Sequence, residues 1–362
     1  MASIGCHCLW ISISIFIILI SLSPQGAGVV SGSDQSESAT APPPECGSET
    51  AGGCRSSIGI VTLKVIAIAS ILVASMLGVG LPMFSRAIPS LQPDTKLFVL
   101  VKAFASGVIL ATGYMHVLPD SFDCLTSDCL PENPWKKFPF TTFVAMLSAL
   151  LTLMVDSYAM SFYRKRRSEA SASAGKVESQ DVEHFHGFHG GSSGAADDNV
   201  GQLLRYRVVA QVLELGIVVH SVVIGLSMGA SENPCTIRPL VAALCFHQFF
   251  EGMGLGGCIL QAEYGLRIKA VMVFFFSATT PFGIALGMGL SHVYSENSPT
   301  ALIVVGLLNA CSAGLLNYMA LVDLLAADFM GAKLQQSMRL QTWAYLAVLL
   351  GAGGMSLMAK WA

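Results

Sequence analysis

Long apolar runs alternate with short polar connections along most of the chain. Eight of these runs approach or exceed the length of about 20 residues that an α-helix needs to cross a bilayer. Runs of this length are too long for barrel strands, so the pattern predicts an all-α integral membrane protein with eight transmembrane helices. The eight runs are Ile58–Leu81, Leu97–Leu118, Phe140–Phe162, Val208–Gly229, Pro239–Leu260, Ile268–Ser291, Ala301–Leu325 and Thr342–Met358.

The chain divides into five segments. Residues 1–27 hold an apolar stretch that ends in small and helix-breaking residues, which predicts a signal peptide; an uncleaved anchor is the alternative. Residues 28–57 are rich in Ser, Pro and Gly and predict a polar extracellular segment. Spans 1–3 follow in 58–162, a histidine-containing cytoplasmic loop in 163–207, and spans 4–8 in 208–362.

Composition supports a membrane-embedded chain. Hydrophobic residues make up 53% and charged residues 12%, whereas soluble domains carry roughly 25% charged residues. The net charge is only −3, and no basic segment is interleaved with aromatic residues. A nucleic-acid partner is therefore not expected. The expected partner is the lipid bilayer.

Charge and cysteine distribution predict the orientation. Basic residues concentrate in the connections after spans 1, 3, 5 and 7, most clearly in RKRR at 164–167, which predicts that these connections are cytoplasmic. Both termini are then extracellular, and the secretory route favours the plasma membrane. Cysteines outside the spans fall on the predicted exterior, where they can oxidise. Cys46–Cys54 and Cys124–Cys129 are the nearest pairings, although spacing leaves the connectivity open.

Three ionisable residues are predicted at the centre of the membrane. His220 lies twelve residues into span 4 and Glu251 twelve residues into span 5, which corresponds to ~18 Å of helix in each case. His247 precedes Glu251 by one helical turn and shares its face. Because the turn between the two spans is short, the helices should be antiparallel neighbours and the three side chains should meet near the midplane.

Two imidazoles and a carboxylate suit a divalent ion such as zinc, iron, copper or nickel. Ser221 and Gln248 adjoin the histidines and are candidate additional ligands or supports for them. The structural alternative is a buried His–Glu hydrogen bond that merely locks two helices.

Further polar groups flank this cluster. His116 and Asp120 share a helix face at the outer end of span 2, where Pro119 is expected to end the helix. They predict an outer entrance for metal, with helix-end solvation as the alternative. Three histidines of the cytoplasmic loop predict a loose, regulatory metal site. These are His184, His186 and His189.

Other charged residues lie nearer the ends of the spans. Lys64 and Lys102 are expected to extend their amines toward the membrane surface. Asp156, Glu214 and Asp323 fall toward the cytoplasmic half. They are expected either to pair with Lys102 or loop arginines, or to line an ion exit.

The sequences ELGIVVHSVVIGLSMG (214–229) and HQFFEGMGLGG (247–257) together resemble the paired signature of the ZIP family of divalent-metal transporters. The resemblance extends through KAFASGVILATGYMHVLPD (102–120) and SAGLLNYMALVDLLAADF (312–329). The forms HVLPD and HQFFEG are similar to those of plant zinc and iron transporters.

The resemblance implies a 3+2+3 inverted-repeat bundle, a homodimer, and alternating access that moves metal into the cytoplasm. Zn²⁺ is the expected substrate, with Fe²⁺, Mn²⁺ or Cd²⁺ as alternatives. The transport site would be lined by His220, Ser221, His247, Gln248 and Glu251. Some bacterial relatives carry a carboxylate where this chain has Ile224 and a glutamine in place of His247, so one main metal position is expected.

The sequence gives less support to two other functional classes. An intramembrane metalloenzyme would need the order His-Glu-x-x-His on one helix, which the span 5 motif lacks. A metal-sensing receptor would need a signalling domain, and none is evident. The chain is therefore expected not to be an enzyme and to need no catalytic cofactor.

Overall fold

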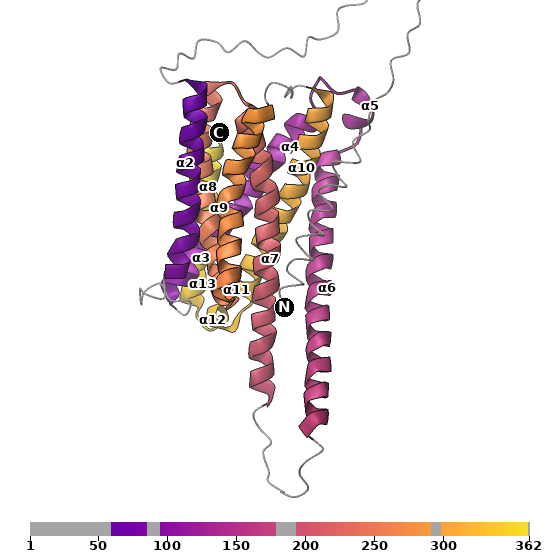
Figure 1. The fold of residues 1–362 in the computed structure, drawn as a ribbon, viewed down its shortest axis with the longest axis vertical. Coiled ribbons are helices and arrows are strands. Elements are labelled where there is room, and N and C mark those ends of the chain that lie inside the picture. The colour runs from indigo at the N-terminus through magenta and orange to yellow at the C-terminus, as the bar shows by residue number, and fades with distance from the viewer. Residues whose placement is uncertain (1–58, 85–94, 179–192, 291–297, 361–362) are drawn as a thin grey trace, which may run out of the picture.

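The computed structural model describes residues 59–84, 95–178, 193–290 and 298–360, and all regular elements in these ranges are helical (Figure 1). Seven helical segments are long and apolar enough to cross a membrane, in agreement with the predicted all-α membrane class. The predicted signal peptide lies outside the described residues. The elements are α2 (Ile60–Phe84), α3 (Lys96–Thr112), η3 (Gly113–Val117), α4 (Leu118–Leu125), α5 (Glu132–Trp135), α6 (Phe140–Glu178), α7 (Ser193–Ala230), α8 (Pro234–Gln261), α9 (Leu266–Leu290), α10 (Pro299–Tyr318), η4 (Met319–Ala326), α11 (Ala327–Phe329), α12 (Ala332–Gln335) and α13 (Met338–Ala359).

Helix α8 is the predicted span that is not among the seven. Its 28 residues are long enough to cross a bilayer, but His247, Gln248 and Glu251 reduce its apolar character. It packs inside the bundle against α2, α3 and α7. The count of eight spans stays a prediction.

Several helices begin at residues suited to that position. Thr95, Ser298 and Ser337 precede α3, α10 and α13, and each side-chain oxygen accepts a hydrogen bond from the backbone N–H three residues later. Asn233 caps α8 in a similar way, by accepting from the backbone N–H of Cys235. These caps satisfy N–H groups that the first helical turn leaves unpaired.

Helices α6 and α7 are longer than the sequence pattern predicted, and they project beyond the other helices at one end (Figure 1). Span 3 was expected to end at Phe162 and span 4 to begin at Val208, but α6 continues to Glu178 and α7 begins at Ser193. The extensions are rich in Ala, Arg, Lys, Glu and Leu, which favour helix once it has been nucleated. The predicted 163–207 loop is therefore largely helical, and its three histidines lie outside the described residues.

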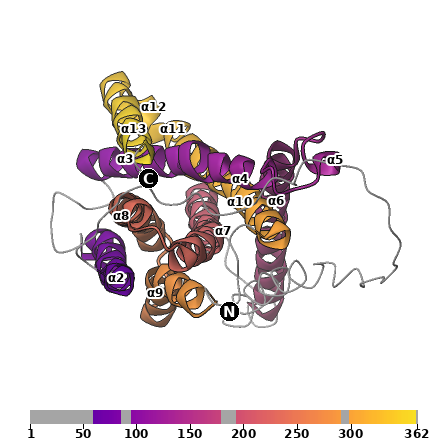
Figure 2. The ribbon, with the colours of Figure 1, turned by 90° about the horizontal axis from the view of Figure 1, so that it is seen from above.

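The helices form two groups (Figure 2). The site group contains α2, α7, α8 and α9, with α2 packed on α8 and α7 on α9. The flanking group contains α3–α4, α6, α10–α11 and α13, with α3 packed on α13 and α10 on α6. The groups meet mainly where α3 contacts α8 and α10 contacts α7. Helices α2, α3 and α6 thus make the same kinds of contact as α9, α10 and α13, as an inverted repeat would require.

Glycines allow the close contacts within the flanking group. A Cβ at Gly107 would lie 2.1 Å from the Val348 carbonyl oxygen, and one at Gly314 would lie 2.1 Å from the Ala145 carbonyl oxygen. Neither distance is sterically possible, so α3 can approach α13, and α10 can approach α6, only with glycine at these positions.

Two π-helical segments interrupt the long helices of the flanking group. Residues Gly113–Val117 include His116, and residues Met319–Ala326 include Asp323. The expectation that Pro119 ends its helix is wrong, because α4 continues from Leu118 to Leu125. Pro119 lies in the first turn of α4, directly after the π segment, where a missing N–H is tolerated.

The two lysines do not reach outward as expected. Lys64 and Lys102 are each 5% exposed. The Lys64 amine donates to the Gly229 carbonyl at 2.7 Å. Both side chains therefore tie helices together inside the bundle instead of extending along its surface.

The nearest-neighbour pairing of Cys124 with Cys129, one of the connectivities that spacing left open, is not formed. Cys124 is a free thiol, whereas Cys129 and Cys235 are each disulfide-bonded. Nearness in sequence does not decide connectivity, because the fold sets which cysteines approach one another.

Candidate metal centre

The three ionisable residues predicted at the centre of the membrane converge in the structure. Their ligand atoms, on His220 of α7 and on His247 and Glu251 of α8, lie within 4.8 Å of one another. Each side chain is at most 1% exposed. Helix α7 ends at Ala230 and α8 begins at Pro234, so a connection of only three residues makes the two helices antiparallel neighbours.

The three side chains do not hydrogen-bond to one another. Among the described residues, neither ring nitrogen of either histidine, nor either carboxylate oxygen of Glu251, has a hydrogen-bond partner. The alternative of a His–Glu hydrogen bond that locks the helices is therefore not formed. Burying such groups unpaired costs about 1–3 kcal/mol each, and more for a charged group, and their lone pairs are free to bind a cation.

The spacing of these atoms fits a metal after a small contraction. Zinc ligands at about 2.0–2.1 Å in tetrahedral geometry lie about 3.3 Å from one another. The donor atoms are separated by up to 4.8 Å, so each pair must approach by at most about 1.5 Å.

Ser221 and Gln248 lie beside the cluster and are also buried. The Ser221 hydroxyl has no hydrogen-bond partner among the described residues. The Gln248 amide oxygen accepts from the Thr280 hydroxyl at 3.4 Å, which directs that amide toward α9. Thr280 was missed from sequence, although the polar stretch 277–280 in an otherwise apolar span was an available signal.

His116 lies closer to the cluster than its depth along the chain predicted. Its ring centroid is 6.2 Å from that of His247, which is in turn 5.6 Å from that of His220. The prediction of a separate outer entrance assumed an upright helix. Viewed from above, however, α3 is seen lengthwise where α2 is seen nearly end-on, so α3 is tilted relative to α2 (Figure 2). The three imidazoles form one continuous row that joins the two helix groups.

Acidic residues continue this row outward. Asp120 is partly exposed and interacts electrostatically with His116 and Asp123. Asp128, in the loop that follows, is paired with Lys136 at 2.5 Å. The Lys136 amine, by hydrogen bonding to that carboxylate, holds the pKa of Asp128 below its usual value.

Toward the opposite end of the bundle, Lys102 does not pair with the acidic residues that were expected as its partners. Its amine pairs with Asp328 at 2.9 Å, and not with Asp156, Glu214 or Asp323. Asp156 instead accepts a hydrogen bond from the Tyr318 hydroxyl at 3.2 Å.

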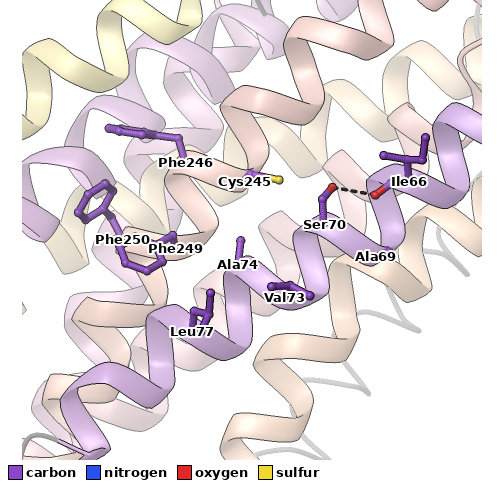
Figure 3. A pocket seen from close by; sticks show the side chains of 10 residues that line it. All are labelled: Ile66, Ala69, Ser70, Val73, Ala74, Leu77, Cys245, Phe246, Phe249 and Phe250. Carbon is purple, nitrogen blue, oxygen red and sulfur yellow. Dashed lines mark hydrogen bonds between the residues drawn. The ribbon is translucent and has the colours of Figure 1, made fainter.

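An apolar groove of about 900 Å³ lies between α2 and α8, but it is not part of the metal cluster (Figure 3). At about 100° per residue, the α8 residues that line it centre on the helix face opposite His247 and Glu251. Its one hydroxyl, on Ser70, donates to the Ile66 carbonyl at 2.8 Å. The lining residues are Ile66, Ala69, Ser70, Val73, Ala74, Leu77, Cys245, Phe246, Phe249 and Phe250.

Comparison with known proteins gives a consistent picture. The family profile described as "ZIP Zinc transporter" matches residues 61–359. The rice protein named Fe(2+) transport protein 2 is 63% identical over 340 residues, covering 89% of this chain and 92% of that protein. Fe(2+) transport protein 1 of Arabidopsis thaliana is 60% identical over 324 residues, covering 88% and 91%. Zinc transporter 7 of the same plant is 55% identical over 362 residues, covering 96% and 97%.

Proposed function

Since this chain belongs to the ZIP zinc transporter family, we propose that it moves zinc into the cytoplasm through the site formed by His220, His247 and Glu251. It is a multi-pass transporter of divalent metal ions and not an enzyme. Movement by alternating access, with the site group shifting against the flanking group, is part of the proposal.

The chemistry of the buried cluster carries this proposal. Two neutral imidazoles and one carboxylate can replace part of the hydration shell of a divalent ion and offset half of its charge. His116 would hand the ion from the acidic outer side to His247, since it lies next in the row. Ser221 and Gln248 would complete or support the ligand set.

Iron is the specific alternative to zinc. Two histidines with one carboxylate are also the ligand set of many non-haem Fe(II) sites. Three relatives with 60% identity or more carry iron in their names. We place zinc first because the matched family profile is described by zinc, and manganese and cadmium remain further candidate substrates.

The remaining parts of the proposal concern assembly and direction. Both termini face the outside of the plasma membrane, and the protein acts as a homodimer, as the family resemblance implies. Metal enters past Asp120 and His116. The histidines of segment 184–189 bind metal loosely and regulate uptake without taking part in the transport step.

Uptake into sealed vesicles tests the proposal. Zinc accumulation should be measured alone and against excess Fe²⁺, Mn²⁺ and Cd²⁺, at a pH of about 7.5 and of about 5.5. His247→Ala should abolish accumulation, while Cys245→Ala, on the groove face of α8, should not. Acidification should slow uptake because protons compete with the metal for the ligand atoms. Accumulation by His247→Ala at the wild-type rate would contradict the site, and stronger inhibition by iron than by unlabelled zinc would favour the iron alternative.

A further inference from the structure

The half of helix α8 that runs from Glu251 to its end at Gln261 packs against α3. A Cβ at Gly254 would lie 3.2 Å from the Ile109 side chain, and one at Gly257 would lie 3.4 Å from the Phe98 ring. Both glycines therefore face side chains of α3 on the side of the site away from His116. This interface is also one of the two main contacts between the site group and the flanking group.

A buried lysine lies at the end of this interface. The Lys102 amine of α3 donates to the Asp328 carboxylate of α11 at 2.9 Å and to the Gln261 side-chain oxygen of α8 at 3.2 Å. Lys102 and Asp328 both belong to the flanking group, whereas Gln261 is the last residue of the helix that carries His247 and Glu251. Lys102 is thus held by its own group and bonds across to the other.

We propose that Lys102, fixed by Asp328, is a latch that closes the Gln261 end of α8 against α3 and must release Gln261 before metal can leave by that route. Asp328 orients the amine and offsets its charge, which makes burial of the lysine tolerable. The bond to Gln261 is a single hydrogen bond from a charged donor, strong enough to favour the closed arrangement and weak enough to break during transport.

The latch is separable from a purely structural role because the bond to Gln261 can be removed while the Lys102–Asp328 ion pair stays. Gln261→Leu removes the bond between the groups and leaves the Lys102–Asp328 ion pair intact. Lys102→Met removes both bonds. Lys96→Met makes the same chemical change at an exposed position at the start of the same helix and is the matched control.

Cys258 supplies a direct readout of opening. It is a free thiol on α8, 1% exposed, within one turn of Gln261 and close enough to Lys102 to interact with it electrostatically. Its reaction with N-ethylmaleimide can be followed peptide by peptide with mass spectrometry in the full-length protein in detergent. Cys245, half-buried on the other half of α8, reports any general loosening of the helix.

We expect Gln261→Leu and Lys102→Met to label Cys258 about tenfold faster than wild type, the effect of losing roughly one hydrogen bond to a charged group. Lys96→Met should label at the wild-type rate, and Cys245 should be unchanged in all variants. An unchanged Cys258 rate in Gln261→Leu would overturn the latch, as would an equal acceleration at Cys245 and Cys258. If Lys102→Met does not fold, Gln261→Leu alone decides.

The latch rests on the proposed function in one respect, which is that α8 moves during transport. Labelling of Cys258 needs neither metal nor uptake. A failure of the metal site in the vesicle assay therefore leaves this measurement interpretable, and the reverse also holds.

Discussion

Replacing Glu251 with glutamine separates metal binding from folding. The substitution keeps the shape of the side chain, removes its charge and exchanges one acceptor oxygen for an NH₂ group. Because both carboxylate oxygens are buried without a hydrogen-bond partner among the described residues, the protein without metal should lose no stability and should gain some, since an unpaired buried charge is costly.

The size of the expected metal effect follows from the donor set. Removing groups that only support a metal ligand costs 10–100-fold in affinity, so loss of the only carboxylate in the cluster should cost at least about 100-fold, or ~2.7 kcal/mol. At a zinc concentration about 100 times the dissociation constant, the wild type gains about 2.7 kcal/mol of stability. With 100-fold weaker binding, Glu251→Gln gains only about 0.4 kcal/mol at the same zinc concentration.

Thermal unfolding in detergent with and without zinc, combined with initial uptake rates in vesicles, measures both effects. Glu263→Gln is the matched control, because it makes the same change at an exposed position two residues beyond the end of α8. The expected result is a variant that unfolds at or above the wild-type temperature without zinc, lacks most of the zinc-dependent shift, and transports at most about 1% of the wild-type rate at limiting zinc. Full retention of the zinc-dependent shift and of uptake would refute the assignment of Glu251 as a ligand.

Other changes probe the remaining parts of the account. His116→Ala should reduce the uptake rate at limiting zinc by about tenfold, less than loss of a central ligand, and an unchanged rate would remove it from the pathway. Replacing the three histidines of segment 184–189 with alanine should leave the initial rate within about twofold at equal surface abundance, and abolished transport would make them part of the essential route. Gly107→Ala would force a Cβ to within 2.1 Å of the Val348 carbonyl oxygen and should destabilise the protein by about 1–3 kcal/mol. Gly289→Ala, with open space around it, should not, and equal unfolding temperatures for the two variants would contradict tight α3–α13 packing.

The class of fold and the central cluster were predictable from local pattern alone. Apolar runs fix the positions of the spanning helices because each must satisfy its own backbone within the bilayer. The connection between Gly229 and Pro239 is short, so His220 had to approach His247 and Glu251. Counting residues from the start of each span was sufficient because α7 and α8 are continuous through the site.

The predictions that were wrong depended on the tilt and packing of helices, which cannot be obtained by counting residues along the chain. The depth of His116 depends on the tilt of α3 and on the π segment at Gly113–Val117, neither of which hydropathy records. The partners of Lys102 depend on which helix ends meet in space, and sequence gave no reason to prefer Asp328. The helical extensions of α6 and α7 were overlooked because hydropathy marks the membrane-spanning part of a helix, not where the helix ends.

The central claim is that His220, His247 and Glu251 hold the transported metal, and a zinc-loaded structure of the wild-type protein tests it most directly. Anomalous diffraction at the zinc edge should locate an ion within about 2.0–2.2 Å of one nitrogen from each histidine and one oxygen of Glu251. Zinc bound inside the membrane-spanning bundle at other residues, with none between α7 and α8, would contradict the claim.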